Sequence, residues 1–227
     1  MISIKELTIS YKKGINVIDS LDLSIGDNTI CGIAGLNGAG KTTLFNSIFG
    51  LIRKEKGEIL FNEQALTKKE IAYLPAENFF YPFITGREYL NLFVNSDIDN
   101  RNKLFKLPLD TIIDDYSTGM KKKLALWGVI SQNRQIIMLD EPFNNLDIEA
   151  CHILKLILLR LKETGKTIII SSHIIESLTN VCDCIHYLES GKVKFSRNKE
   201  QFGGLEKELF SMIESENTEA IKELIKY

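Results

Sequence analysis

The chain has 227 residues, 44% of them hydrophobic and 26% charged, and a formal net charge of −2 at pH 7. Its length suffices for one large domain with a buried core, and a nearly neutral chain has no strong overall field that draws it to nucleic acid or anionic lipid. No apolar run reaches the ~18 residues that a membrane-spanning helix needs, and the N-terminus lacks the basic and apolar regions of a signal peptide, so we expect a cytosolic protein.

The N-terminal third has the pattern of strands around one loop and one helix. Its first two segments alternate apolar and polar side chains with period two, which predicts short antiparallel strands at an edge. A compact apolar strand that ends in glycine follows, and then a helical pattern that closes near Gly50. The predicted strands are 2–10, 17–25, 28–35, 57–64 and 71–77.

The segment 79–130 is irregular and helical. Thr85 has Glu88 three residues after it, which predicts a capping box at the start of a helix. A second helix is predicted at 123–131.

Strands and helices alternate in the remainder of the chain. Buried-type strands are predicted at 135–140 and 166–173, with a long helix between them. A hairpin through Ser190 and Gly191 follows, and residues 205–227 have the pattern of a charged amphipathic helix. Continuous apolar strands between helices predict an α/β fold with a mostly parallel sheet covered on both faces.

The sequence therefore predicts a single domain over 1–227 with internal subdivisions. Its parts are a core with an antiparallel β edge (1–78 and 131–204), a short helical subdomain (79–130) and a C-terminal helical tail (205–227).

The cysteines, at 31, 151, 182 and 184, are expected to be reduced in a cytosolic chain. A strand through this region would place Cys182, Cys184 and His186 on one face, which admits a metal ion. No fourth ligand is evident, so buried thiols are the favoured interpretation.

The segment "GLNGAGKT" at 35–42 fits the phosphate-binding pattern G-x-x-x-x-G-K-[ST], between a predicted strand and a predicted helix. Glycines let the backbone curl around an anion, and the helix N-terminus adds its dipole. Lys41 would reach the phosphates, and the Thr42 hydroxyl would be offered to Mg²⁺. A glycine-rich turn without a ligand is the alternative.

A buried strand ends in two adjacent carboxylates, Asp140 and Glu141. Ligands bind at this end of strands in open α/β sheets. We expect Asp140 to hold Mg²⁺ through water and Glu141 to orient an attacking water. Two ordinary charged residues at a strand end are the alternative.

The segment "YSTGMKKKLALWG" at 116–128 runs from a polar turn into three lysines and then into an apolar helical pattern. A nucleic-acid patch, a solvated helix face and part of a site are the three interpretations. The short lysine run lacks interleaved aromatic side chains, which argues against nucleic acid.

Taken together, 35–42, 136–141 and 116–126 resemble the ATP-binding-cassette (ABC) ATPases over nearly the full length of the chain. The segment 116–126 is similar to a variant form of the family signature, "NNLD" at 144–147 is similar to the loop after the second carboxylate, and "SSH" ends where the family has its switch histidine. The resemblance implies a P-loop NTPase core that binds ATP and Mg²⁺.

The resemblance also implies the site residues. Glu141 and His173 would be catalytic, Ser117 and Gly119 would act on the ATP of a second subunit, and Asp147 would belong to the loop at 144–147. Thr42 and Asp140 would hold Mg²⁺, and lysines 121–123 would mostly form a solvated face. The implied nucleotide-binding residues are Tyr11 (stacking on adenine), Gly35, Asn37, Gly38, Ala39, Gly40, Lys41, Thr42 and Thr43.

Departures from the family pattern are also present. Ala76 stands at the usual metal-reaching glutamine, so either Glu77 substitutes or coordination relies on Thr42, Asp140 and water. Thr118 and Met120 replace a glycine and a glutamine of the signature. Only residues 91–115 separate the helical segment "ITGREYL" (84–90) from the signature segment that begins at Tyr116. The helical subdomain is therefore expected to be short.

The resemblance implies an ATP-hydrolysing subunit that powers a membrane transporter, by preference an exporter, through ATP-driven dimerisation. Its partners would be an identical or paralogous ATPase subunit and a separate transmembrane permease, with no nucleic acid, at the inner face of the cell membrane. The alternatives are a soluble ABC protein acting on ribosomes, DNA or cofactor assembly, and a non-catalytic nucleotide-binding regulator.

Overall fold

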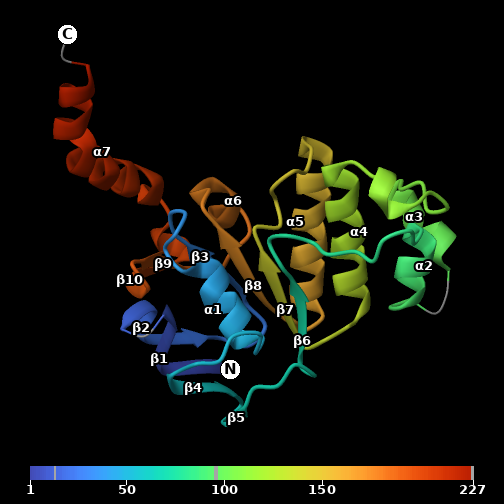
Figure 1. Ribbon diagram of the computed structural model, residues 1–227, viewed down its shortest axis with the longest axis horizontal. Coiled ribbons are helices and arrows are strands. Elements are labelled where there is room, and N and C mark those ends of the chain that lie inside the picture. The colour runs from blue at the N-terminus through green and yellow to red at the C-terminus, as the bar shows by residue number, and fades with distance from the viewer. Residues whose placement is uncertain (13, 95–96, 226–227) are drawn as a thin grey trace.

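Two β-sheets form the frame of the molecule. The computed structural model describes residues 1–12, 14–94 and 97–225, and it places a four-stranded antiparallel sheet against a six-stranded sheet (Figure 1). The smaller sheet has the order β2-β1-β4-β5. Its strands are β1 (Ile2–Lys12), β2 (Ile15–Ile25), β4 (Lys56–Phe61) and β5 (Gln64–Ala65). The first two strands are longer than the short strands expected from the sequence.

The larger sheet has the order β10-β9-β3-β8-β7-β6, and all neighbours pair in parallel except β10 with β9. The expectation of a mostly parallel sheet is confirmed. β3, β7 and β8 are buried along their whole length, which explains their continuous apolar sequences. The strands are β3 (Ile30–Ala34), β6 (Ile71–Leu74), β7 (Ile136–Asp140), β8 (Thr167–Ser172), β9 (Cys184–Glu189) and β10 (Lys192–Asn198).

Helices pack against the larger sheet, and the green and yellow ones lie on the right of Figure 1. The α-helices are α1 (Lys41–Ile48), α2 (Gly86–Asn91), α3 (Ile98–Phe105), α4 (Thr118–Ser131), α5 (Ile148–Glu163), α6 (Ile175–Thr179) and α7 (Leu205–Leu224). The 3₁₀ helices are η1 (Ile113–Asp115) and η2 (Lys199–Gln201).

The buried side chains form separate clusters on the two faces of the larger sheet. One cluster lies between the sheets and includes Leu44 and Phe45 of α1. The other lies between the larger sheet and its helices, and includes Leu126 of α4 and Leu158 of α5. Burial of these side chains removes apolar surface from water and fixes the ends of the parallel strands, where the site is built.

A third cluster holds the helical segment between β6 and β7 together, and includes Leu90, Leu109 and Trp127. The predicted capping box is present: the Thr85 side chain accepts from the Glu88 backbone N–H, and the Glu88 carboxylate accepts from the Thr85 N–H at 2.8 Å. The division of the chain into core, helical subdomain and tail stays a prediction.

The first turns of α7 pack against the body through the buried Leu205 and Leu209. The remainder of the helix extends away from both sheets (Figure 1). Among the helices that the structure describes, none combines the length and the hydropathy of a membrane-spanning segment.

Candidate active site

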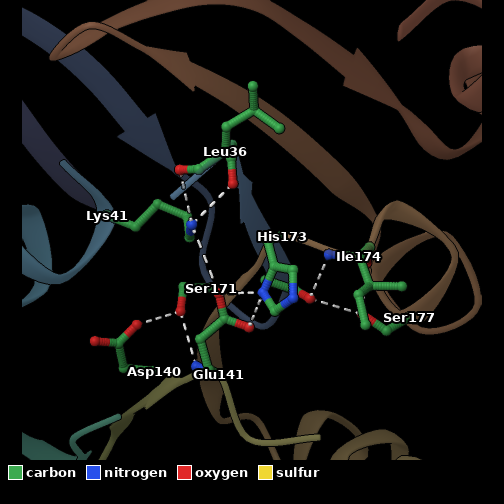
Figure 2. Close-up of polar contacts among 10 residues, drawn as sticks. Leu36, Lys41, Asp140, Glu141, Ser171, His173, Ile174 and Ser177 are labelled. Carbon is green, nitrogen blue, oxygen red and sulfur yellow. Dashed lines mark hydrogen bonds and ion pairs between the residues drawn. The ribbon is translucent and has the colours of Figure 1, made fainter. Parts of the chain in front are cut away.

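A tight loop joins β3 to α1 and surrounds one ammonium group. Gly38 and Gly40 have φ values of +83° and +104°, which favour glycine. A Cβ on Gly35 would lie 2.4 Å from the backbone oxygen of Leu188 on β9, so a larger residue does not fit there. Lys41 Nζ donates to the Gly35 and Leu36 carbonyls at 2.8 and 3.2 Å (Figure 2). The chain thus folds this loop around a nearly buried cation.

A cavity of ≈ 390 Å³ opens over the loop. Tyr11 does not line it, but the Tyr11 hydroxyl lies 3.2 Å from Thr43 Oγ1, and the ring is exposed at that end of α1. The N-terminus of α1 and the Lys41 ammonium give the cavity a positive floor that suits phosphate. The lining residues are Val17, Asn37, Gly38, Gly40, Lys41, Thr42, Thr43, Ala76 and Glu141.

Ala76 lines the cavity whereas its neighbour Glu77 does not. Of the two ways to replace the usual glutamine, the geometry therefore favours the one that leaves metal coordination to other residues.

Asp140 is fully buried at the end of β7. It pairs in parallel register with Ser171 of β8, and the Ser171 hydroxyl donates to Asp140 Oδ1 (Figure 2). Asp140 Oδ2 is also buried but has no hydrogen-bond partner among the described residues. A buried carboxylate oxygen without a donor is costly, so this atom fits the position of a cation ligand.

Ser171 is a site residue that the sequence analysis missed. Besides donating to Asp140, its hydroxyl accepts from the Glu141 N–H at 2.9 Å. The hydroxyl therefore holds both carboxylate-bearing residues in place. The sequence did contain a signal for it, because the apolar strands that lead to Asp140 and to Ser171 both end in polar residues. Parallel neighbours end at the same edge of a sheet, so these polar ends could have been expected to meet.

Glu141 lies where three loops converge (Figure 2). His173 Nδ1 is 3.0 Å from both of its carboxylate oxygens, and Lys41 Nζ is 3.6 Å from Oε1. Glu141 also has a φ of 48°, an uncommon conformation for a residue with a side chain. The structure thus brings the predicted Lys41, Glu141 and His173 together at one point.

Ser117 and Gly119 lie at the start of α4 and do not line the cavity of their own chain. Ser117 is the N-cap, and its hydroxyl accepts from the Met120 N–H at 3.2 Å. A Cβ on Gly119 would lie 2.8 Å from the Asn145 carbonyl. Thr118 is the first residue of the helix, so its side chain requires no left-handed backbone.

Asp147 caps α5 and links it to α4. Its Oδ1 accepts from the Ala150 N–H at 2.7 Å, and its Oδ2 lies 3.0 Å from Lys123 Nζ. The Ala150 N–H, and after it Lys123, hold the pKa of Asp147 below its ordinary value.

The expectation that lysines 121–123 mostly form a solvated face is wrong for Lys122. Lys121 Nζ donates to the Asp114 carbonyl at 3.1 Å, and Lys123 pairs with Asp147, but Lys122 is only 3% exposed. Burial lowers the pKa of Lys122 to about 8, against the opposing attraction of Asp140 and Glu141. The middle lysine thus belongs to the interior, close to the carboxylates.

Lys122 should make stability depend on pH. Its pKa is about 8 in the fold and 10.5 ordinarily, so between these values the unfolded chain binds more protons and stability rises with pH. Relative to Lys122→Met, the wild-type free energy of unfolding should rise by roughly 2–3 kcal/mol from pH 7 to pH 10. Urea unfolding with EDTA present measures this difference, and Lys121→Met is the matched control. A difference that does not change with pH would contradict the assignment.

Comparison with known proteins decides the family. A family model described as "ABC transporter" matches residues 18–144, which is more than half of the chain. The chain belongs to the ABC transporter family. The family resemblance drawn from the sequence is therefore confirmed, and the chain is an ATP-binding subunit with ATPase chemistry.

The relatives of this ABC ATPase include two proteins of Bacillus subtilis. The ABC transporter ATP-binding protein NatA is 30% identical over 92% of this chain and 88% of its own length. The uncharacterized ABC transporter ATP-binding protein YhcH is 31% identical, over 85% of this chain and 68% of its own. The solved structure of CbiO1 from Clostridium perfringens, described as part of the ABC transporter complex CbiONQ, has a TM-score of 0.73 at 26% identity and covers 94% of both chains.

Proposed function

We propose that this ABC ATPase powers a membrane transporter by closing, as one of two subunits, around two ATP molecules. The observation that carries the proposal is the position of Ser117 and Gly119, which lie outside the cavity of their own chain. Ser117 is exposed and leads into the N-terminus of a helix, an arrangement that suits an anion from outside the chain. Closure would be favoured because ATP contacts both subunits, and hydrolysis would remove one of those contacts.

In this proposal, each chain supplies the hydrolytic groups for the ATP in its own cavity. The loop 35–43 binds the phosphates, with Lys41 exchanging its carbonyl partners for phosphate oxygens, and Tyr11 stacks on the adenine. Glu141 orients the attacking water, and His173 holds the Glu141 carboxylate through the contact of 3.0 Å.

The residues present fit a Mg²⁺ ion. Asp140 Oδ2 is buried without a hydrogen-bond partner among the described residues, and Thr42 lines the cavity with an exposed side chain. Oxygen donors of these kinds are the ligands that Mg²⁺ prefers. We propose that Asp140 and Thr42 hold the ion, which would neutralise charge on the phosphates.

A membrane partner is supported by an exposed aromatic segment between β6 and α2. Phe79, Tyr81 and Phe83 are 77%, 65% and 82% exposed, and side chains of this kind are enriched in protein interfaces. CbiO1 belongs by its description to a multi-subunit transporter complex. We propose that 79–83 meet a separate transmembrane permease at the inner face of the membrane. Export is the preferred direction because the signature segment at 117–120 resembles the variant form seen in many exporter ATPases of the family.

A mixing experiment tests the paired arrangement. Lys41→Ala removes the ammonium group that binds the phosphates, and Ser117→Arg blocks the surface offered to the second subunit. Each variant alone should therefore lack ATPase activity. A mixed dimer has one site without either change. When the two variants are mixed in equal amounts and assort at random, half of the dimers are mixed. Each mixed dimer has one intact site of two, so the mixture should recover about a quarter of wild-type turnover.

The control replaces Ser117→Arg by the double variant Lys41→Ala/Ser117→Arg, which can form no intact site with Lys41→Ala. Phosphate release is measured at chain concentrations where wild-type turnover per chain is constant. A mixture that stays inactive, or a Ser117→Arg variant with wild-type turnover, would contradict the proposed action of Ser117 on a second subunit.

A further inference from the structure

A cluster of two cysteines and a histidine lies away from the nucleotide cavity, between the two sheets. Cys31 of β3 and Cys184 of β9 are direct partners in the parallel strand pair, and His186 follows on the same face of β9. Their two sulfurs and one imidazole nitrogen all lie within 4.8 Å of one another. Cys31 is fully buried, and the other two side chains are partly buried.

The cluster differs from the one expected from the sequence. β9 begins at Cys184, so Cys182 precedes the strand and packs among the helices on the opposite face of the sheet. The expectation that Cys182 shares a face with Cys184 and His186 is therefore wrong. The missing ligand is Cys31, which the parallel register of β3 and β9 places beside Cys184.

The histidine is oriented as metal-binding histidines are. His186 Nδ1 lies 2.7 Å from the Ser196 hydroxyl on the paired strand β10, which leaves Nε2 on the side of the thiols, 4.0 Å from Cys184 Sγ. An outer partner that fixes the ring in this way is a regular companion of metal ligation.

We propose that Cys31, Cys184 and His186 bind a zinc ion. Zinc prefers thiolate and imidazole ligands in tetrahedral geometry, with Zn–S bonds of about 2.3 Å, so ligand atoms then lie about 3.7 Å apart. The cluster needs to contract by about 1 Å or less to reach that spacing. Two thiolates and a neutral imidazole balance the charge of Zn²⁺, whereas a monovalent copper ion would leave a net negative charge in a largely buried place. Water would complete the tetrahedron.

Zinc and cobalt titrations of the untagged full chain, kept reduced, test the inference. We expect one zinc ion per chain at this site, and a cobalt complex with the thiolate-to-metal charge-transfer band of cysteine ligation. Cys184→Ser and His186→Gln should weaken zinc binding at least about 100-fold, and Ser196→Ala should weaken it about tenfold. The matched control, Cys151→Ser, changes a cysteine on α5 outside the cluster and should bind zinc as the wild type does.

ATP binding of each variant reports whether it has folded, and it keeps this test independent of the transport proposal. The charge-transfer band is measured on the wild type, so it stands even if a variant does not fold. A wild-type chain that takes up no zinc, a cobalt complex without the thiolate band, or full zinc affinity in folded Cys184→Ser would overturn the inference.

Discussion

Glu141→Gln should lower ATP hydrolysis at least about 100-fold and leave ATP binding intact. The amide has nearly the shape of the carboxylate, but it cannot orient and polarise water as the charged group does, and positioned groups of this kind contribute ~10²–10⁴ in rate. Glu141 is held by His173 and Lys41, so the substitution acts on the point where three loops converge. Steady-state phosphate release and equilibrium binding of ATP measure the two quantities.

Glu163→Gln is the matched control, because this residue ends α5 on the surface and pairs only with the exposed Arg160 among the ion pairs of the described residues. It should leave turnover unchanged. If Glu141→Gln retained more than about a tenth of wild-type turnover, the role assigned to the carboxylate would be wrong.

Lys41→Ala should weaken ATP binding at least about 100-fold, which corresponds to roughly 3 kcal/mol. The Lys41 ammonium is the cation enclosed by the loop, where it donates to the Gly35 and Leu36 carbonyls. Charge-assisted hydrogen bonds to phosphate in such a nearly buried place are stronger than those on an open surface. Binding of a fluorescent ATP analogue, followed as protein is added, gives the affinity.

The control for this change is Lys56→Ala, at an exposed lysine at the start of β4. A circular-dichroism melt shows whether each variant remains folded. An affinity of folded Lys41→Ala within about threefold of the wild type would mean that the loop binds phosphate through its backbone and helix N-terminus alone.

Residues whose role depends on neighbours in sequence could be predicted from the sequence. The glycines and Lys41 of the loop follow a strand and open a helix, and Thr85 caps α2 with Glu88, because each arrangement is set by a few consecutive residues. Asp140 and Glu141 could be placed because a buried strand ends there.

Residues whose role depends on strand register or distant packing could not be predicted. Ser171 touches Asp140 only because β8 pairs with β7 in one particular register, and Cys31 meets Cys184 for the same reason on β3 and β9. Lysine side chains are almost always exposed, so the sequence predicts Lys122 at the surface, yet α4 places it in the interior.

The left-handed backbone conformation of Glu141 favours one residue type for stability and another for the proposed chemistry. Glycine would adopt the φ of 48° without the cost, of order 1–3 kcal/mol, that a side chain brings. The backbone at this position therefore favours glycine, which lacks the carboxylate that the proposed mechanism uses. Under the proposed mechanism, stability and turnover therefore compete at this one position, because a glycine would relieve the backbone and remove the group that is proposed to orient water.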